Sequence, residues 1–155
     1  MTDPSPPGFA RRFHVGWNDV DANRHMANLR YLAMAADVRV MYFSAHGFPA
    51  AEFARLQIGP VIKSEQLEYF RELHLLDQVR VTLLSAGLSD DASRFRIRNE
   101  FWRDDGALAA RVTSQGGWLD LRARKLAPPP EALAAALRAI PRAPDFAVIP
   151  TTRDP

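Results

Sequence analysis

The sequence contains no cysteine among its 155 residues. The protein therefore forms no disulfide bond, binds no metal through a thiolate and uses no cysteine nucleophile. This composition is typical of a cytoplasmic protein. Apolar runs long enough to cross a bilayer are also missing, and residues 1–13 lack the apolar segment of a signal peptide. The four histidines lack the spacing of a metal site, so we expect neither a bound metal nor a cofactor.

The sequence has little excess charge of either sign: it contains 20 basic and 18 acidic residues, so the net charge is +2. Overall charge therefore does not predict nucleic-acid binding. Apolar residues make up 47% of the chain and charged residues 25%, as in a globular protein of one domain. We expect a single domain over residues 10–140. Residues 1–9, with three prolines, predict a flexible N-terminal arm, and residues 141–155, which show no periodicity, a flexible C-terminal tail.

Hydrophobic periodicity changes along the chain. Alternation predicts strands over residues 11–17, 61–71, 76–88, 94–102 and 107–119. The clearest strand is 94–102, which places Phe95, Ile97, Asn99 and Phe101 on one face. Helices are predicted at 131–140 and over a long segment that begins near Asn28 and ends near Gly47.

The long predicted helix is apolar on almost every side. Its main apolar face consists of Leu29, Ala33, Ala36, Val40 and Phe43. We expect such a helix to be buried on nearly all sides. An antiparallel sheet of about five strands, curved around this helix, uses all of these surfaces. The predicted architecture is therefore α+β, arranged as in the hotdog fold.

The segment before this helix, DVDANRHMANLRY at residues 19–31, resembles the signature of hotdog-fold acyl-CoA thioesterases, which include the 4-hydroxybenzoyl-CoA thioesterases. The matching residues are Asp19, Asp21, His25, Asn28 and Tyr31, with Asp37 and Arg39 further along the helix. The sequence departs from the signature at two positions. Arg24 replaces its glycine, and Ala27 replaces its first asparagine.

The resemblance implies that the protein hydrolyses acyl-CoA thioesters. Asp21 would act as nucleophile or as general base on water. Backbone N–H groups near Asn28 and Leu29 would polarise the carbonyl, which exposed amides at a helix start can do. His25 would hydrogen-bond the carboxylate, orient water or contact the thioester, and Tyr31 would lie against the substrate. From the residues alone, the default role of the two aspartates is that of turn or capping residues, and the main role of Asn28 is that of an N-cap.

Arginines supply candidate contacts to the phosphates of coenzyme A. Arg122 and Arg124 form one candidate clamp. The row Arg94, Arg96 and Arg98 is either a second one, a subunit contact or a solvated sheet face. By analogy with hotdog domains we expect a homodimer or a higher homo-oligomer that pairs open sheet edges. Glu65 or Glu68 of the partner would then complete the site.

Three functions follow from these patterns. The first is acyl-CoA thioesterase activity, with an acyl-CoA as the small-molecule substrate. The second is a non-catalytic protein that binds acyl thioesters, which the departures at Arg24 and Ala27 favour. The third is a hotdog hydratase or dehydratase, in which an Asp–His pair acts on a hydroxyacyl chain.

Overall fold

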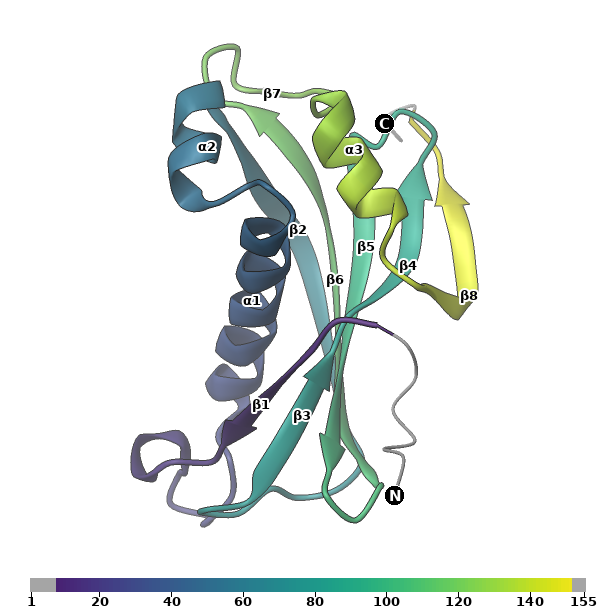
Figure 1. Cartoon of the computed structure of the whole chain (residues 1–155). Helices are drawn as coiled ribbons and strands as arrows, with labels where there is room; N and C mark the ends of the chain where they lie inside the picture. Colours follow the sequence, from purple (N-terminus) through teal and green to yellow (C-terminus); the bar gives the residue numbers. More distant parts are fainter. Residues whose placement is uncertain (1–7, 152–155) are drawn as a thin grey trace.

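The computed structural model describes residues 8–151, in which one long helix lies against a strongly curled sheet (Figure 1). The elements in chain order are β1 (Ala10–His14), η1 (Trp17–Asp19), α1 (Asn28–Ala45), α2 (Ala50–Leu56), β2 (Ile58–Tyr69), β3 (Gln78–Thr82), β4 (Leu84–Ser89), β5 (Arg94–Arg103), β6 (Leu108–Asp120), β7 (Lys125–Leu126), α3 (Glu131–Arg138) and β8 (Arg142–Ile149). Most of the expected N-terminal arm, residues 1–7, lies outside the described part.

The eight strands form one sheet in which β5 is central. β6 borders one side of β5, and β2 borders β6 as an outer strand. β3 and β4 share the other side of β5, and they pair in turn with β1 and β8. Every pair is antiparallel except β4 with β8. The predicted hotdog architecture is confirmed, with eight strands instead of about five.

The expected strand over residues 76–88 is divided in the structure. β3 ends at Thr82 and β4 begins at Leu84, with buried Leu83 between them. β3 pairs with β1 whereas β4 pairs with β8, so the outer partner of the sheet changes at this point. The division of this segment into β3 and β4 therefore results from pairing with two strands that are distant in sequence, β1 and β8, and the local residue pattern does not predict it.

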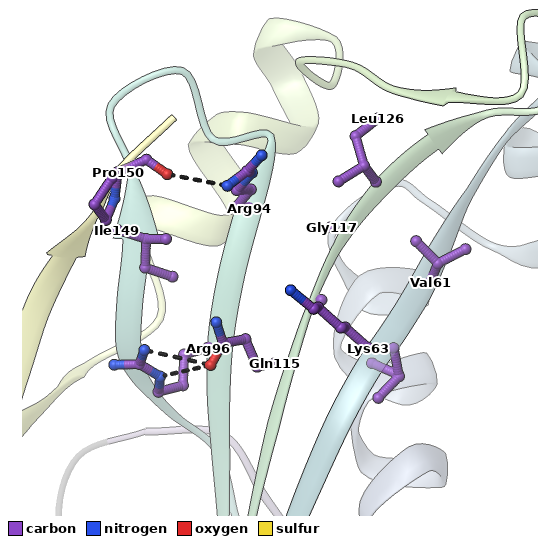
Figure 2. Close-up of a pocket in the computed structure, with 11 residues that line it drawn as sticks. Val61, Lys63, Arg94, Arg96, Gln115, Gly117, Leu126, Ile149 and Pro150 are labelled. Carbon is purple, nitrogen blue, oxygen red and sulfur yellow. Dashed lines mark hydrogen bonds between the residues drawn. The ribbon is translucent and has the colours of Figure 1, made fainter. Parts of the chain in front are cut away.

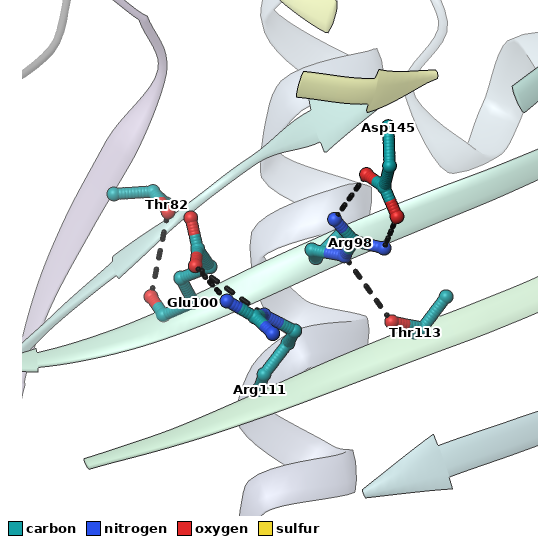
Figure 3. A network of polar contacts seen from close by, with 6 residues as sticks. All are labelled: Thr82, Arg98, Glu100, Arg111, Thr113 and Asp145. Atoms are coloured by element: carbon teal, nitrogen blue, oxygen red, sulfur yellow. Dashed lines mark hydrogen bonds and ion pairs between the residues drawn. The ribbon is translucent and has the colours of Figure 1, made fainter. Parts of the chain in front are cut away.

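The prediction of a C-terminal tail without regular structure was wrong for residues 142–149, which form β8. β8 pairs in parallel with β4, and the chain reaches it from α3, after passing through β5, β6 and β7. Arg98 fastens β8 across the sheet: its Nη1 and Nη2 donate to the two carboxylate oxygens of Asp145 at 2.7 and 2.9 Å (Figure 3). These partners are far away in sequence, so the local pattern gives no sign of them.

Only one face of α1 is buried. Its buried residues are Tyr31, Met34, Ala35, Val38, Tyr42 and Phe43. They face the inner row of β5, where Phe95, Ile97, Asn99 and Phe101 are all at most 2% exposed, as predicted. The expected burial of α1 on nearly all sides was wrong, since Leu29 and Val40 are 71% and 64% exposed. A single sheet covers one side of a helix, and this chain leaves the other side open to solvent.

Across residues 8–151, no helix combines the length and the apolar character needed to cross a membrane.

Candidate functional site

The segment between η1 and α1 folds into a compact turn that carries Asp21. The Asp21 N–H donates to His25 O at 3.1 Å, and the Arg24 N–H donates to Asp21 O at 3.0 Å. The Asn23 N–H donates to Asp21 Oδ1 at 2.8 Å. Arg24 adopts φ +68°, the left-handed conformation that favours glycine. Backbone hydrogen bonds therefore define both the turn and the orientation of the Asp21 carboxylate.

Asp19 attaches this turn to the rest of the protein. Its buried carboxylate accepts the Gly16 N–H at 2.7 Å and lies 2.5 Å from Arg30 Nε. Its backbone carbonyl accepts the Ala27 N–H at 2.8 Å. The hydrogen bonds of Asp19 and its contact with Arg30 hold the segment between η1 and α1 against the beginning of α1. Asp19 therefore has a structural role, whereas the Asp21 carboxylate lies in the exposed part of the same segment.

The beginning of α1 exposes unpaired backbone donors. Ala27 is the N-cap and Asn28 the first helical residue, so the expectation that Asn28 caps the helix was wrong. Over the described part of the chain, the N–H groups of Asn28 and Leu29 have no hydrogen-bond partner. Such groups carry the positive end of the helix dipole. They can therefore stabilise a developing negative charge.

One cleft of about 390 Å³ brings four of the predicted residues together. Its lining residues are Asp21, His25, Met26, Asn28, Tyr31, Tyr69, Phe70, Arg71 and Glu72. They come from the turn, the first turn of α1 and the end of β2. Leu29, whose backbone N–H is predicted to polarise the substrate carbonyl, is not among the lining residues, and its side chain is 71% exposed. The cleft thus joins an exposed carboxylate, an imidazole and the start of a helix.

Tyr31 forms the inner wall of the cleft and is 2% exposed. Its ring makes edge-to-face contacts with Tyr69 and Phe101, with centroids 5.4 and 5.2 Å apart. Burial, together with nearby Tyr69 and Glu72, raises the pKa of Tyr31 to about 12. The phenol is therefore neutral at physiological pH and can donate a hydrogen bond into the cleft.

A second acidic group, Glu72, lies at the rim and was missed by the sequence analysis. Its Oε1 is 3.5 Å from His25 Nε2, and its Oε2 is 3.2 Å from His74 Nε2. In the sequence, only the closeness of Glu72 to His74 pointed to this cluster. The third member, His25, lies in a distant segment, so its contact with Glu72 could not be predicted from local spacing. Glu72 can orient the His25 ring. In the described chain, no group of three or more potential ligands is arranged to hold a metal ion.

The predicted clamp of Arg122 and Arg124 lies away from this cleft. Both side chains are exposed on the turn between β6 and β7, at the opposite end of the sheet from the Asp21 turn (Figure 1). Arg122 Nε donates to Gln57 Oε1. Within one chain, the structure does not bring these arginines together with Asp21, and their role as a clamp stays a prediction.

A basic groove of about 530 Å³ lies near the same end, on the sheet face opposite α1 (Figure 2). Its charged lining residues within the described range 8–151 are Lys63, Arg94 and Arg96. Gly116 and Gly117 are part of its lining, and Gly116 lets β2 approach β6 closely, because a Cβ there would lie 1.9 Å from Val61 O. A groove lined by three cationic side chains suits a phosphate-bearing ligand.

Comparisons with known proteins agree with this architecture. A model of the thioesterase-like superfamily matches residues 15–137. Among solved structures, the hypothetical protein SAV2348 from Staphylococcus aureus, in complex with CoA, has a TM-score of 0.79 at 23% identity. That match covers 95% of this chain and 89% of the other. No match to a curated protein is found.

Two further solved structures that are similar to this chain are thioesterases with named substrates. The 1,4-dihydroxy-2-naphthoyl-CoA thioesterase Slr0204 from Synechocystis has a TM-score of 0.76 at 20% identity, covering 84% of this chain and 96% of its own. The gentisyl-coenzyme A thioesterase BH1999 has a TM-score of 0.73 at 20% identity, covering 83% and 98%. These similarities cover more than four-fifths of this chain and nearly the full length of the other two proteins.

Proposed function

The chain belongs to the thioesterase-like superfamily, and we propose that it is an acyl-CoA thioesterase, which hydrolyses an acyl-CoA to a free acid and coenzyme A. The observation that carries the proposal is the shared cleft of Asp21, His25 and the start of α1. A carboxylate beside free helix N–H groups supplies the two things that thioester hydrolysis needs: activation of an oxygen nucleophile and stabilisation of an oxyanion.

In the proposed reaction, Asp21 takes a proton from a water molecule whose oxygen attacks the thioester carbonyl carbon. The carbonyl oxygen becomes negative and is stabilised by the N–H groups of Asn28 and Leu29. The tetrahedral intermediate collapses, the C–S bond breaks, and the CoA thiolate receives the proton from Asp21. His25, oriented by Glu72, contacts the same water or the thioester. In a variant of this route, the Asp21 carboxylate itself attacks the carbonyl carbon, the C–S bond breaks and the CoA thiolate leaves. Water then hydrolyses the mixed anhydride, which regenerates the Asp21 carboxylate and supplies the proton that the thiolate takes up.

We also propose that two chains pair through β2 to form a homodimer. β2 is a 12-residue outer strand whose only partner in the described sheet is β6, and open edges of this kind favour pairing. Antiparallel pairing of two β2 strands places the Ile58 end of one beside the Tyr69 end of the other. The basic groove and Arg122 of one chain then approach the cleft of its partner, where they can bind the phosphates of CoA.

The proposal is tested by measuring thiol release from short, long and aromatic acyl-CoA substrates. Asp21→Asn should lower turnover by about 100-fold or more, since general bases typically contribute 10²–10⁴-fold. The matched control is Asp90→Asn, which changes an exposed aspartate in the turn after β4. Equal thermal unfolding of both variants shows that the loss is not misfolding. Full activity in Asp21→Asn would remove Asp21 from the mechanism.

The alternative favoured by Arg24 and Ala27 is a non-catalytic protein that binds acyl thioesters. It predicts saturable binding of CoA esters without thiol release from any substrate in the panel. A hydratase would instead change the absorbance of an enoyl-CoA such as crotonyl-CoA while the thioester stays intact. The same assays therefore distinguish all three functions.

A further inference from the structure

A second cavity, which we call the apolar chamber, lies beside the C-terminal half of α1. It has a volume of about 330 Å³ and is lined by side chains of α1, α2, β2 and β5, including Phe43, Phe53, Ile62 and Ile97. Among residues 8–151, Arg39 is the only charged residue in its lining. An apolar cavity with a single cation indicates a ligand that is mostly apolar and carries an acceptor at one point.

Arg39 is only partly satisfied by the protein. Its Nη1 donates to Ser114 Oγ at 3.0 Å and, more weakly, to Asn99 Oδ1 at 3.4 Å. Both partners are fully buried. In the part of the chain that the structure describes, Nε and Nη2 have no hydrogen-bond partner, and no carboxylate oxygen lies within 4.0 Å of the guanidinium. Three N–H donors therefore remain available.

The acidic group whose charge acts on Arg39 is Glu65, and it is linked to Arg39 only indirectly. The Ser114 hydroxyl donates to Glu65 Oε2 at 2.9 Å while its oxygen accepts from Arg39. Burial lowers the pKa of Arg39, with Glu65 opposing the shift, yet an arginine stays charged in this range. A charge removed from water is costly unless it is paired, and the free side of Arg39 has the planar fork that binds a carboxylate bidentately.

The chamber and the catalytic cleft border the same two elements. The cleft contains Asn28 of α1 and Tyr69 of β2, whereas the chamber contains Arg39 of α1 and Ile62 of β2. At about 1.5 Å per helical residue, Arg39 lies about 16 Å along α1 from Asn28. That distance corresponds to a medium-length acyl chain extending away from the thioester.

We propose that the chamber binds the acyl chain of a thioester whose far end is a carboxylate, and that Arg39 is the residue that selects this end. The substrate class is then the CoA monothioesters of dicarboxylic acids. This inference rests on the proposed thioesterase function. Arg39 does not touch the reacting carbonyl, so its effect is on the choice of substrate.

The first test compares dodecanedioyl-CoA with dodecanoyl-CoA, which differ only at the far end of the chain. Wild-type protein should prefer the dicarboxylic substrate in kcat/KM. Arg39→Met should lower kcat/KM for dodecanedioyl-CoA by about 10- to 100-fold, the range for losing a charge-assisted hydrogen bond, and leave dodecanoyl-CoA nearly unchanged. Arg39→Lys, which keeps the charge, should keep part of the preference. Equal effects on both substrates would overturn the proposal.

The matched control is Arg111→Met, which removes another half-buried arginine, on the sheet face opposite α1, where Arg111 pairs with Glu100 at 3.2 Å. This variant should not change the ratio between the two substrates. If Arg39→Met does not fold, Arg39→Gln keeps a polar group of intermediate length and is measured instead. An unchanged substrate ratio in a folded Arg39→Gln protein would equally refute the role of Arg39.

The second test does not depend on catalysis. Titration calorimetry with dodecanoate and dodecanol measures the contribution of the carboxylate to binding. Wild-type protein should bind dodecanoate at least 10-fold more tightly than dodecanol, and Arg39→Met should abolish the difference. A preference that disappears in Arg39→Met without any thioester hydrolysis would refute the proposed function and support the chamber. Normal hydrolysis with no preference in either protein would refute the chamber alone.

Discussion

Replacement of Arg24 by glycine tests how the turn that carries Asp21 is built. Arg24 occupies φ +68° in the turn that presents Asp21 and His25, at the position where the thioesterase signature has glycine. Its side chain is exposed and makes no hydrogen bond or ion pair with any residue from 8 to 151. The substitution therefore removes backbone strain without removing a hydrogen bond or ion pair to the described residues, so its main effect is on the backbone.

The expected gain can be worked out from two opposing effects. A left-handed conformation costs a residue with a Cβ about 1–2 kcal/mol. Replacement by glycine removes this cost, but it also increases the entropy of the unfolded chain, which lowers the free energy of unfolding by about 0.4–1 kcal/mol. Arg24→Gly should thus stabilise the protein by about 0.5–1 kcal/mol. For a domain of this size that corresponds to a rise in Tm of about 1–4 °C.

The assay is thermal unfolding of wild type, Arg24→Gly and the matched control Arg24→Ala. Alanine removes the arginine side chain but keeps the Cβ, so its Tm should stay close to that of wild type. Thiol release by Arg24→Gly should be at least equal to wild type, because the hydrogen bonds that orient Asp21 are unchanged. A glycine variant no more stable than the alanine variant would refute the assignment of strain to this turn.

Two further predictions concern the sheet. Gly116→Ala should lower the free energy of unfolding by about 1–3 kcal/mol, because the new Cβ would lie 1.9 Å from Val61 O; Gly59→Ala, with its nearest atom at 4.0 Å, is the mild control, and equal Tm values would contradict the strand spacing. The hydrogen bond from Arg98 lowers the pKa of Asp145 from 3.8 to about 2, so the contribution of this pair is present above pH 4 and is lost as pH falls through about 2. Asp145→Asn should therefore make the decrease in Tm between pH 4 and pH 2 shallower, and an unchanged slope would show that the pair does not stabilise β8.

The sequence alone determined the parts of this protein that depend on local pattern. Strict alternation over residues 94–102 predicted both the strand and its buried face, since successive strand residues point to opposite sides of a sheet. The DVDANRHMANLRY segment predicted an acidic turn before a long helix, and with it Asp21, His25, Asn28 and Tyr31 of the cleft. Those residues are close in sequence, so their spacing was sufficient to place them together.

Tertiary structure decided everything that joins distant segments. Three contacts join residues that are far apart in sequence and that no local periodicity relates. Glu72 lies beside His25, β8 pairs with β4, and Ser114 links Glu65 to Arg39. Which side of α1 is covered was also decided there. The sequence of a helix that is apolar on most sides does not show which face will be buried. In the structure, the sheet packs against the face that carries Tyr31 and leaves Leu29 exposed.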